Sequence, residues 1–148
     1  MSISGNPRVW DKDVLLHVSA LDREYMPFHW TQDEWLRLSQ DHLLYRWDRG
    51  GEIIGFALFA ASNLDEVAHL LKIVMSPDFR GTGETQQFWE SILHEWHVDS
   101  WSRIYLEVQE SNHSAMKFYE KVGFKQLRRV PQFYSNGDAA YTMQCELS

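Results

Sequence analysis

The stretch AHLLKIVMSPDFRGTGET, residues 68–85, joins an apolar segment to a glycine loop. Its first part, residues 68–75, is almost continuously apolar, which predicts a strand buried on both faces. From Phe88 onward, large apolar residues recur every four positions, which predicts an amphipathic helix. The stretch therefore predicts a strand that passes through a glycine loop into a helix. At such a place, backbone N–H groups can bind a pyrophosphate.

The segments before this stretch predict two helices and two strands. Apolar residues at helical spacing lie between Asp11 and Asp41, and the run at residues 26–30 interrupts them. Thr31 followed by Glu34 is typical of a capping box at the start of the second helix. Two strands joined by a turn are then expected, at residues 42–47 and 52–61.

After the glycine loop and its helix, the pattern predicts a strand, a helix and a final hairpin. Asn112 is a candidate N-cap for that helix, and Gly123 is a candidate stop. Asn136-Gly137 is typical of a hairpin turn. The expected strands cover residues 103–108, 124–133 and 139–147. The whole order predicts one α/β domain, residues 1–148, in which a crossover helix joins a parallel pair of strands.

Three interpretations of the glycine loop compete. A P-loop requires G-x-x-x-x-G-K-[ST], which the sequence lacks. A dinucleotide fingerprint requires G-x-G-x-x-G, but Gln86 occupies the last position, and the chain is short for a dinucleotide-binding sheet with a substrate domain. The third interpretation, another phosphate-binding loop, depends on motifs further along the chain. On its own, the loop is equally a glycine entry to a helix that binds nothing.

Two motifs resemble the signatures of the GNAT superfamily of acetyl-CoA-dependent N-acetyltransferases. The loop RGTGET, residues 80–85, is similar to the family's R/Q-x-x-G-x-G/A loop, and residues 112–124 are similar to its N-x-x-A-x-x-x-Y-x-x-x-G-F signature. Further segments resemble the RimI-type branch, which acetylates protein N-termini: LEV at 106–108, MPFHWT at 26–31, Arg128-Arg129 and Phe133-Tyr134. The resemblance covers residues 14–147. It implies a mixed, mainly antiparallel sheet with splayed central parallel strands, flanked by helices.

The resemblance also implies roles in acetyl transfer. Transfer from a thioester to an amine needs a neutral amine and a proton for the departing thiolate. The positions that match the family are Glu107 for the base and Tyr119 for the acid. From the residues alone, Glu107 is equally an exposed strand carboxylate and Tyr119 a packing residue of an amphipathic helix.

Further positions are implied to bind the co-substrate acetyl-CoA and the acceptor. Backbone N–H groups of the loop would cradle the pyrophosphate, with Arg80 at the rim, while β-strand main chain would hold the pantetheine arm. Asn112 either contacts the arm or only caps its helix. The implied cofactor-binding residues are Ile73, Val74, Met75, Arg80, Gly81, Thr82, Gly83, Glu84, Thr85 and Asn112; the implied acceptor-binding residues are Phe28, Trp30 and Tyr134.

The sequence departs from the family pattern at two kinds of position. The family prefers an apolar residue where Glu84 stands and glycine or alanine where Thr85 stands, and a carboxylate at 84 faces the phosphates unless it points away. A strand common at the start of the family has no clear counterpart before Asp11.

Composition excludes several other classes. With 14 Lys and Arg against 21 Asp and Glu, the chain carries −7, which disfavours nucleic acid and anionic membranes as partners. The single Cys145 forms no internal disulfide and favours a packing role in a reducing, cytoplasmic setting. The longest nearly apolar run, residues 53–61, is too short to span a membrane, and we expect no leader segment.

No metal site is expected, because His94 and His97 have no third ligand at suitable spacing. The seven tryptophans and other aromatics favour a bulky core over a flat binding surface. The expected partner is the α-amine of a protein or peptide N-terminus. Two alternatives stay open: a small-molecule amine as acceptor, and a non-catalytic module that binds acyl-CoA or peptide. The oligomeric state is left open.

Overall fold

The computed structural model describes residues 11–38, 41–62, 66–96 and 101–147. Its elements run in the order α1 (Lys12–Tyr25), α2 (Gln32–Leu36), β1 (His42–Arg49), β2 (Glu52–Ser62), β3 (Val67–Met75), a short 3₁₀ turn (Pro77–Phe79), α3 (Glu84–Glu95), β4 (Arg103–Gln109), α4 (His113–Lys121), β5 (Lys125–Val130) and β6 (Ala140–Glu146). The predicted order of helices and strands is confirmed. The sequence shows no clear counterpart of the family's first strand before Asp11, and that segment lies outside the described residues.

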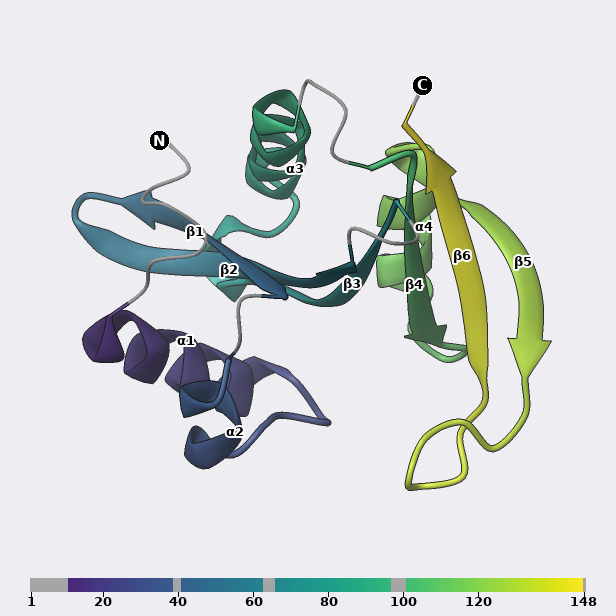
Figure 1. Ribbon diagram of the computed structural model, residues 1–148, viewed down its shortest axis with the longest axis horizontal. Helices are drawn as coiled ribbons and strands as arrows, with labels where there is room; N and C mark the ends of the chain where they lie inside the picture. Colours follow the sequence, from purple (N-terminus) through teal and green to yellow (C-terminus); the bar gives the residue numbers. More distant parts are fainter. Residues whose placement is uncertain (1–10, 39–40, 63–65, 97–100, 148) are drawn as a thin grey trace.

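Six strands form one mixed sheet in the order β1-β2-β3-β4-β6-β5. Every neighbouring pair is antiparallel except β3 and β4, which are parallel and are joined through α3. Figure 1 shows that β1–β3 run across the view while β4–β6 stand upright, so the sheet bends sharply between its two halves. This arrangement is the mixed α/β fold that the sequence predicted.

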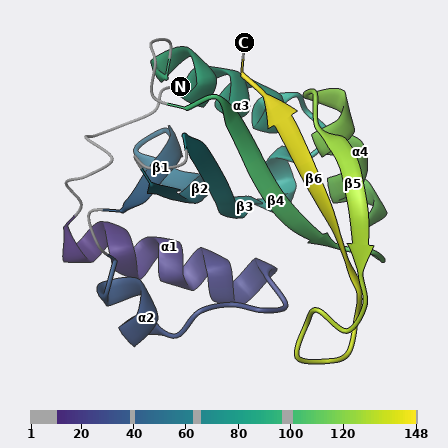
Figure 2. The same cartoon turned by 45° about the vertical axis from the view of Figure 1, so that its right-hand side comes forward.

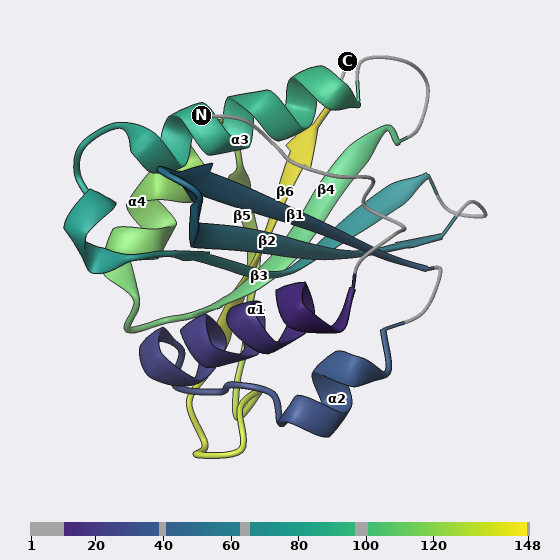
Figure 3. The same cartoon turned by 90° about the vertical axis from the view of Figure 1, so that its left-hand side faces the viewer.

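The helices cover the two faces of the sheet in pairs. α1 and α2 lie on one face, and α3 and α4 lie on the other (Figure 3). Each face has its own core. The first is centred on Val18, Trp35 and Phe56, and the second on Phe59, Phe88 and Trp89. The expectation that the aromatic residues build the core is met by these fully buried rings.

The helix termini follow from local sequence. Asp11 caps α1 by accepting a hydrogen bond from Val14 N, and Thr31 with Glu34 forms the predicted capping box of α2. Gly83 starts α3 with φ +86°, a left-handed conformation that glycine adopts without strain. The glycine loop is therefore a tight turn whose last backbone N–H groups lie at the N-terminus of α3.

The parallel pairing of β3 with β4 is short. It covers residues 67–69 of β3 against residues 103–105 of β4. Beyond that point β3 stays paired with β2, and β4 stays paired with β6, so the two strands part (Figure 2). The remainder of β3, up to Met75, consequently has an open main-chain edge.

β3 contributes buried side chains to both cores, Leu70 and Met75 to one and Val74 to the other, as its apolar run predicted. One prediction about strands needs correction. The strand expected at 124–133 ends at Val130, and Asn136-Gly137 lies inside a longer connection to β6. In that connection Tyr134 N donates to Asp138 O at 3.0 Å, so the turn closes within the loop. None of the described helices is long and apolar enough to cross a membrane.

Candidate active site

A cleft of about 720 Å³ lies where β3 and β4 part. Its walls are the second half of β3, the end of β4, the glycine loop, α4 and the two loops that follow α1 and β5. Most of the residues singled out from the sequence line it: Phe28, Trp30, Ile73, Val74, Met75, Arg80, Gly81, Gly83, Thr85, Glu107, Asn112, Tyr119 and Tyr134. Thr82 and Glu84 do not.

The glycine loop presents open main chain to this cleft. Gly81 and Gly83 have φ of +74° and +86°, and a Cβ added at either would meet nothing within 4 Å. Among the described residues, the N–H groups of Gly81, Gly83 and Thr85 have no hydrogen-bond acceptor. The N-terminus of α3 carries a partial positive charge behind them. Such a group of donors fits a phosphate or pyrophosphate.

Glu84 points away from these donors. Its carboxylate is buried and accepts hydrogen bonds from Trp47 Nε1 at 3.0 Å and Arg49 Nη1 at 3.1 Å. The Arg49 guanidinium also lies 5.2 Å from the centre of the Phe79 ring. The departure from the family pattern at this position therefore places no charge in the cleft, and the acid links α3 to β1.

Charge within the cleft is positive, although the chain as a whole carries −7. Glu107 is the one acid among the described residues that line it, against Lys72, Arg80 and Lys121. Arg80 is held at the rim: its Nε donates to Met75 O at 2.9 Å, and its guanidinium lies 5.6 Å from the centre of the Tyr25 ring. An anionic ligand is favoured at this end of the cleft.

The open edge of β3 offers further donors and acceptors. Ser76 N donates to Ile54 O across the β2–β3 pair. Because main-chain groups alternate sides along a strand, Val74 then also faces β2, whereas Ile73 and Met75 face the gap beside β4. An extended ligand could pair there as an added strand.

Glu107 lies beside two side chains of the parallel pair. His69 Nε2 is 2.7 Å from Glu107 Oε1, and His69 is the register partner of Tyr105. Burial, and then the neighbouring Glu107 carboxylate, raise the pKa of Tyr105 above its usual value. Glu107 is therefore a carboxylate oriented by a histidine at the point where β3 and β4 begin to part.

Two tyrosines from other elements line the same cleft as Glu107. Burial, with a smaller effect of Tyr134, raises the pKa of Tyr119 far above its usual value. Burial, and then the charge of Glu107, raise the pKa of Tyr134 to about 12. Both phenols stay protonated at neutral and mildly alkaline pH, so each can donate a proton or a hydrogen bond. Tyr134 also stacks on Phe28, with ring centres 4.9 Å apart and planes 11° from parallel.

Asn112 and the remaining sequence candidates are also placed. Asn112 Oδ1 accepts a hydrogen bond from Ala115 N at 3.2 Å, so it caps α4 while it lines the cleft. Cys145 is a buried free thiol in β6. In the part of the chain that the structure describes, no group of three potential metal ligands occurs; His97 lies outside that part.

Sequence reasoning missed His69, Lys72 and Asp22. His69 and Lys72 are polar residues within an otherwise apolar strand, and Asp22 continues the buried face of α1 that carries Leu15 and Val18. A charged residue at a position where the periodicity requires an apolar one is a signal that could have drawn attention to both Lys72 and Asp22.

Comparisons with known proteins agree with this geometry. The acetyltransferase (GNAT) family profile matches residues 12–124. An N-alpha-acetyltransferase of Sulfolobus acidocaldarius is 24% identical over 93% of this chain and 86% of its own length. A [ribosomal protein bS18]-alanine N-acetyltransferase of Haemophilus ducreyi is 28% identical over 67% of each chain. The ribosomal-protein-S18-alanine N-acetyltransferase of Escherichia coli has the same fold, with a TM-score of 0.86 and 21% identity over 99% of this chain and 94% of that one.

Replacement of Gly83 by valine should abolish the stabilisation of the protein by coenzyme A. The branched side chain would occupy the space above the loop donors, and a ligand that binds only the native state raises the melting temperature by mass action. Gly51, in the β1–β2 turn, is a matched control, since it has φ +79° and equally open surroundings. Both variants should melt below the wild type without ligand, but only Gly51→Val should retain the coenzyme A shift. An equal shift in Gly83→Val would remove the phosphate site from this loop.

Proposed function

The chain belongs to the GNAT family of acetyltransferases, and we propose that it transfers the acetyl group of acetyl-CoA to the α-amine at the N-terminus of a protein or peptide. One observation carries the proposal: the carboxylate of Glu107 and the protonated phenol of Tyr119 line the same cleft as the open glycine loop. The names of the Sulfolobus and Haemophilus relatives, an N-alpha-acetyltransferase and a ribosomal-protein alanine N-acetyltransferase, support an N-terminal acceptor.

Acetyl-CoA would lie along the cleft from the glycine loop to Glu107. Its pyrophosphate suits the free N–H groups of Gly81, Gly83 and Thr85. Its pantetheine arm suits the open main chain of Ile73 and the N–H of Met75, whose carbonyl already accepts from Arg80. A main-chain N–H at this edge would polarise the thioester carbonyl and stabilise the oxyanion that forms on attack.

The proposed reaction is a direct attack in a ternary complex. A peptide α-amine has a pKa of about 7.7–8.0, so at neutral pH most of it is protonated. Glu107 takes one proton from the ammonium, directly or through one water, and the amine nitrogen attacks the thioester carbon. The C–S bond then breaks, the Tyr119 hydroxyl gives its proton to the leaving thiolate, and the resulting phenolate takes the second proton of the acylated nitrogen, directly or through one water. The raised pKa of Tyr119 keeps that proton in place until the thiolate forms.

The aromatic wall of the cleft bears on the choice of acceptor. Phe28 and Tyr134 come from opposite loops and touch, so they bridge the cleft near Glu107. A free chain end can pass beside such a bridge, whereas the side chain of an internal lysine would bring two continuous backbone segments against it. The same bridge makes a small amine the second candidate acceptor.

Mass analysis of products decides between these acceptors. Purified protein is incubated with acetyl-CoA and three acceptors: a lysine-free peptide with a free N-terminus, the same peptide with a blocked N-terminus and one internal lysine, and a mixture of small primary amines. We expect one acetyl group on the first peptide and little on the others. Acetylation of small amines alone would shift the function to the second candidate, and no acetylation of any acceptor would favour a binding module.

Loss of the Tyr119 hydroxyl should slow the chemical step. Tyr119→Phe removes the proton donor but keeps the ring that packs beside Phe124, so the fold and coenzyme A binding should be unchanged. We expect kcat to fall by about 10²–10⁴-fold in steady-state assays. Tyr141→Phe, on β6, is the control and should stay near wild type. A near-normal kcat for Tyr119→Phe would leave this tyrosine with a packing role.

Removal of the Glu107 charge should produce a defect that depends on pH. If Glu107 is the base, Glu107→Gln should lower kcat/KM most at and below neutral pH, where the acceptor amine is mainly protonated. Above a pH of about 8 the free amine accumulates unaided, and the defect should shrink. The measurement is kcat/KM against pH on the lysine-free peptide. Parallel profiles of the variant and the wild type would mean that Glu107 only positions the substrate.

A further inference from the structure

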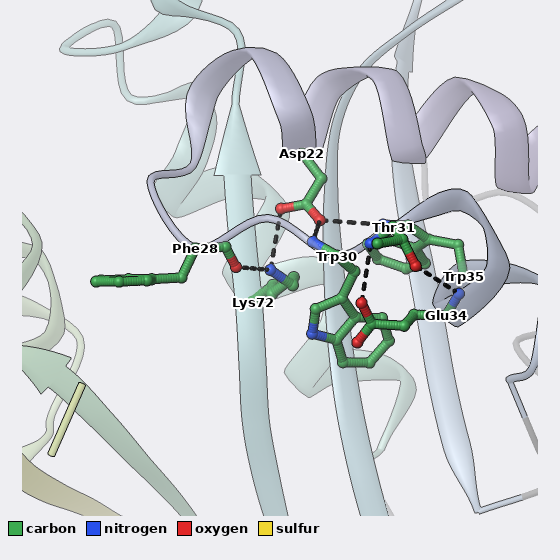
Figure 4. A network of polar contacts seen from close by, with 7 residues as sticks. All are labelled: Asp22, Phe28, Trp30, Thr31, Glu34, Trp35 and Lys72. Carbon is green, nitrogen blue, oxygen red and sulfur yellow. Dashed lines mark hydrogen bonds and ion pairs between the residues drawn. The ribbon is translucent and has the colours of Figure 1, made fainter. Parts of the chain in front are cut away.

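A buried ion pair connects α1 to the strand that forms the cleft wall. Asp22, on α1, is fully buried, and Lys72, on β3, is 6% exposed. Lys72 Nζ lies 3.0 Å from Asp22 Oδ1. The other carboxylate oxygen accepts hydrogen bonds from Trp30 N at 2.8 Å and Trp35 Nε1 at 3.0 Å (Figure 4). Both carboxylate oxygens of Asp22 and the ammonium of Lys72 thus have partners within the protein.

The same pair holds the loop between α1 and α2, residues 26–31, on which Phe28 lies. Asp22 O accepts from Met26 N at 2.8 Å, and Asp22 Oδ2 accepts from Trp30 N, so Asp22 fixes both sides of the loop. Lys72 Nζ donates to Phe28 O at 3.0 Å and fixes its middle. Figure 4 shows Lys72 between Asp22 and the Phe28 carbonyl, with the Phe28 ring extended beyond it.

A contribution to the stability of the fold does not by itself explain this buried ion pair. Two charges lose their hydration in the interior, and replacement of a buried pair by apolar side chains is often neutral or stabilising. An apolar side chain at position 72, however, would leave the Phe28 carbonyl without its donor. The specific effect of Lys72 is therefore to set the position of the Phe28 main chain, and through it the ring that stacks on Tyr134.

We propose that Lys72 and Asp22 are positioning residues for the acceptor: they fix Phe28 against Tyr134 and so set the width of the cleft beside Glu107. The inference rests on the proposed function for its substrate, but the placement of Phe28 can be measured without turnover. Under the same proposal the glycine loop and the main chain of β3 hold acetyl-CoA, and the side chains of Asp22, Lys72 and Phe28 make none of its proposed contacts. Loss of the pair should consequently affect the acceptor and spare acetyl-CoA.

The test uses the double variant Asp22→Asn/Lys72→Met, because Lys72→Met alone would leave a buried carboxylate unpaired and could unfold the protein. Asparagine keeps an oxygen for Trp30 N and Trp35 Nε1. We expect the peptide KM to rise between about 10- and 100-fold, with the acetyl-CoA KM within about twofold of wild type. Arg129→Met, which breaks the exposed ion pair with Glu110, is the control and should change neither.

A double-mutant cycle with Phe28→Ala separates a positioning role from a general loss of rigidity in the cleft. If Lys72 acts through Phe28, the double variant should add no more than about twofold to the peptide KM once Phe28 is alanine. Full multiplication of the two effects, or an equal rise in the acetyl-CoA KM, would overturn the proposal.

The ring signals of Tyr134 in an aromatic NMR spectrum give a readout that needs no activity. Phe28→Ala removes the stacked ring and should shift them, and the double variant should shift them in the same direction. Unchanged Tyr134 signals in a folded double variant would overturn the positioning role. A wild type that acetylates no peptide would contradict the proposed function instead, while the Tyr134 signals would still decide the placement of Phe28.

Discussion

The parting of β3 from β4 is the constraint on which the site depends. Parallel pairing stops after His69 and Tyr105, because β3 remains tied to β2 and β4 remains tied to β6. The carboxyl ends of both strands then face one gap, and the segments that follow them, the glycine loop and the Asn112 turn, meet at its rim. Open main chain, a helix N-terminus and a carboxylate reach the same cleft because two neighbouring strands separate there. Ligand sites at the carboxyl ends of parallel strands are common for this reason.

The positions of the acidic residues determine the charge along this cleft. Asp22 and Glu84 belong to elements beside the cleft, but neither lines it. Each is buried and paired with a cation and a tryptophan N–H. Glu107 is left as the acid that lines the described cleft. A cofactor with negative charges can thus enter at the Arg80 end, while an ammonium group meets a carboxylate at the other. Under the proposed function, charge along one channel would distinguish the two substrates.

Local sequence was sufficient for the elements and for the two motifs, and insufficient for the contacts between them. The glycine loop and the capping box of α2 are short-range patterns, so their positions could be predicted closely. The end of β5 could not, because apolar and aromatic residues continue past Val130 into the loop that carries Phe133 and Tyr134. The pairs His69–Glu107 and Asp22–Lys72 join residues 38 and 50 positions apart. The pairing of β3 with β4 brings the first together, and the packing of α1 on β3 brings the second together. The single lysine in an apolar strand, which sequence reasoning missed, is a signal of an internal partner but does not identify the acid that pairs with it.

A crystal structure with a conjugate that links coenzyme A through an acetyl spacer to the α-amine of a peptide tests the central claim most directly. The pyrophosphate should accept hydrogen bonds from the N–H groups of Gly81, Gly83 and Thr85. The sulfur should face the Tyr119 hydroxyl, and the peptide nitrogen should lie about 2.6–3.2 Å from Glu107 or one water away. A pyrophosphate bound away from the glycine loop, or a peptide nitrogen beyond the reach of Glu107, would contradict the claim that one cleft between β3 and β4 performs the transfer.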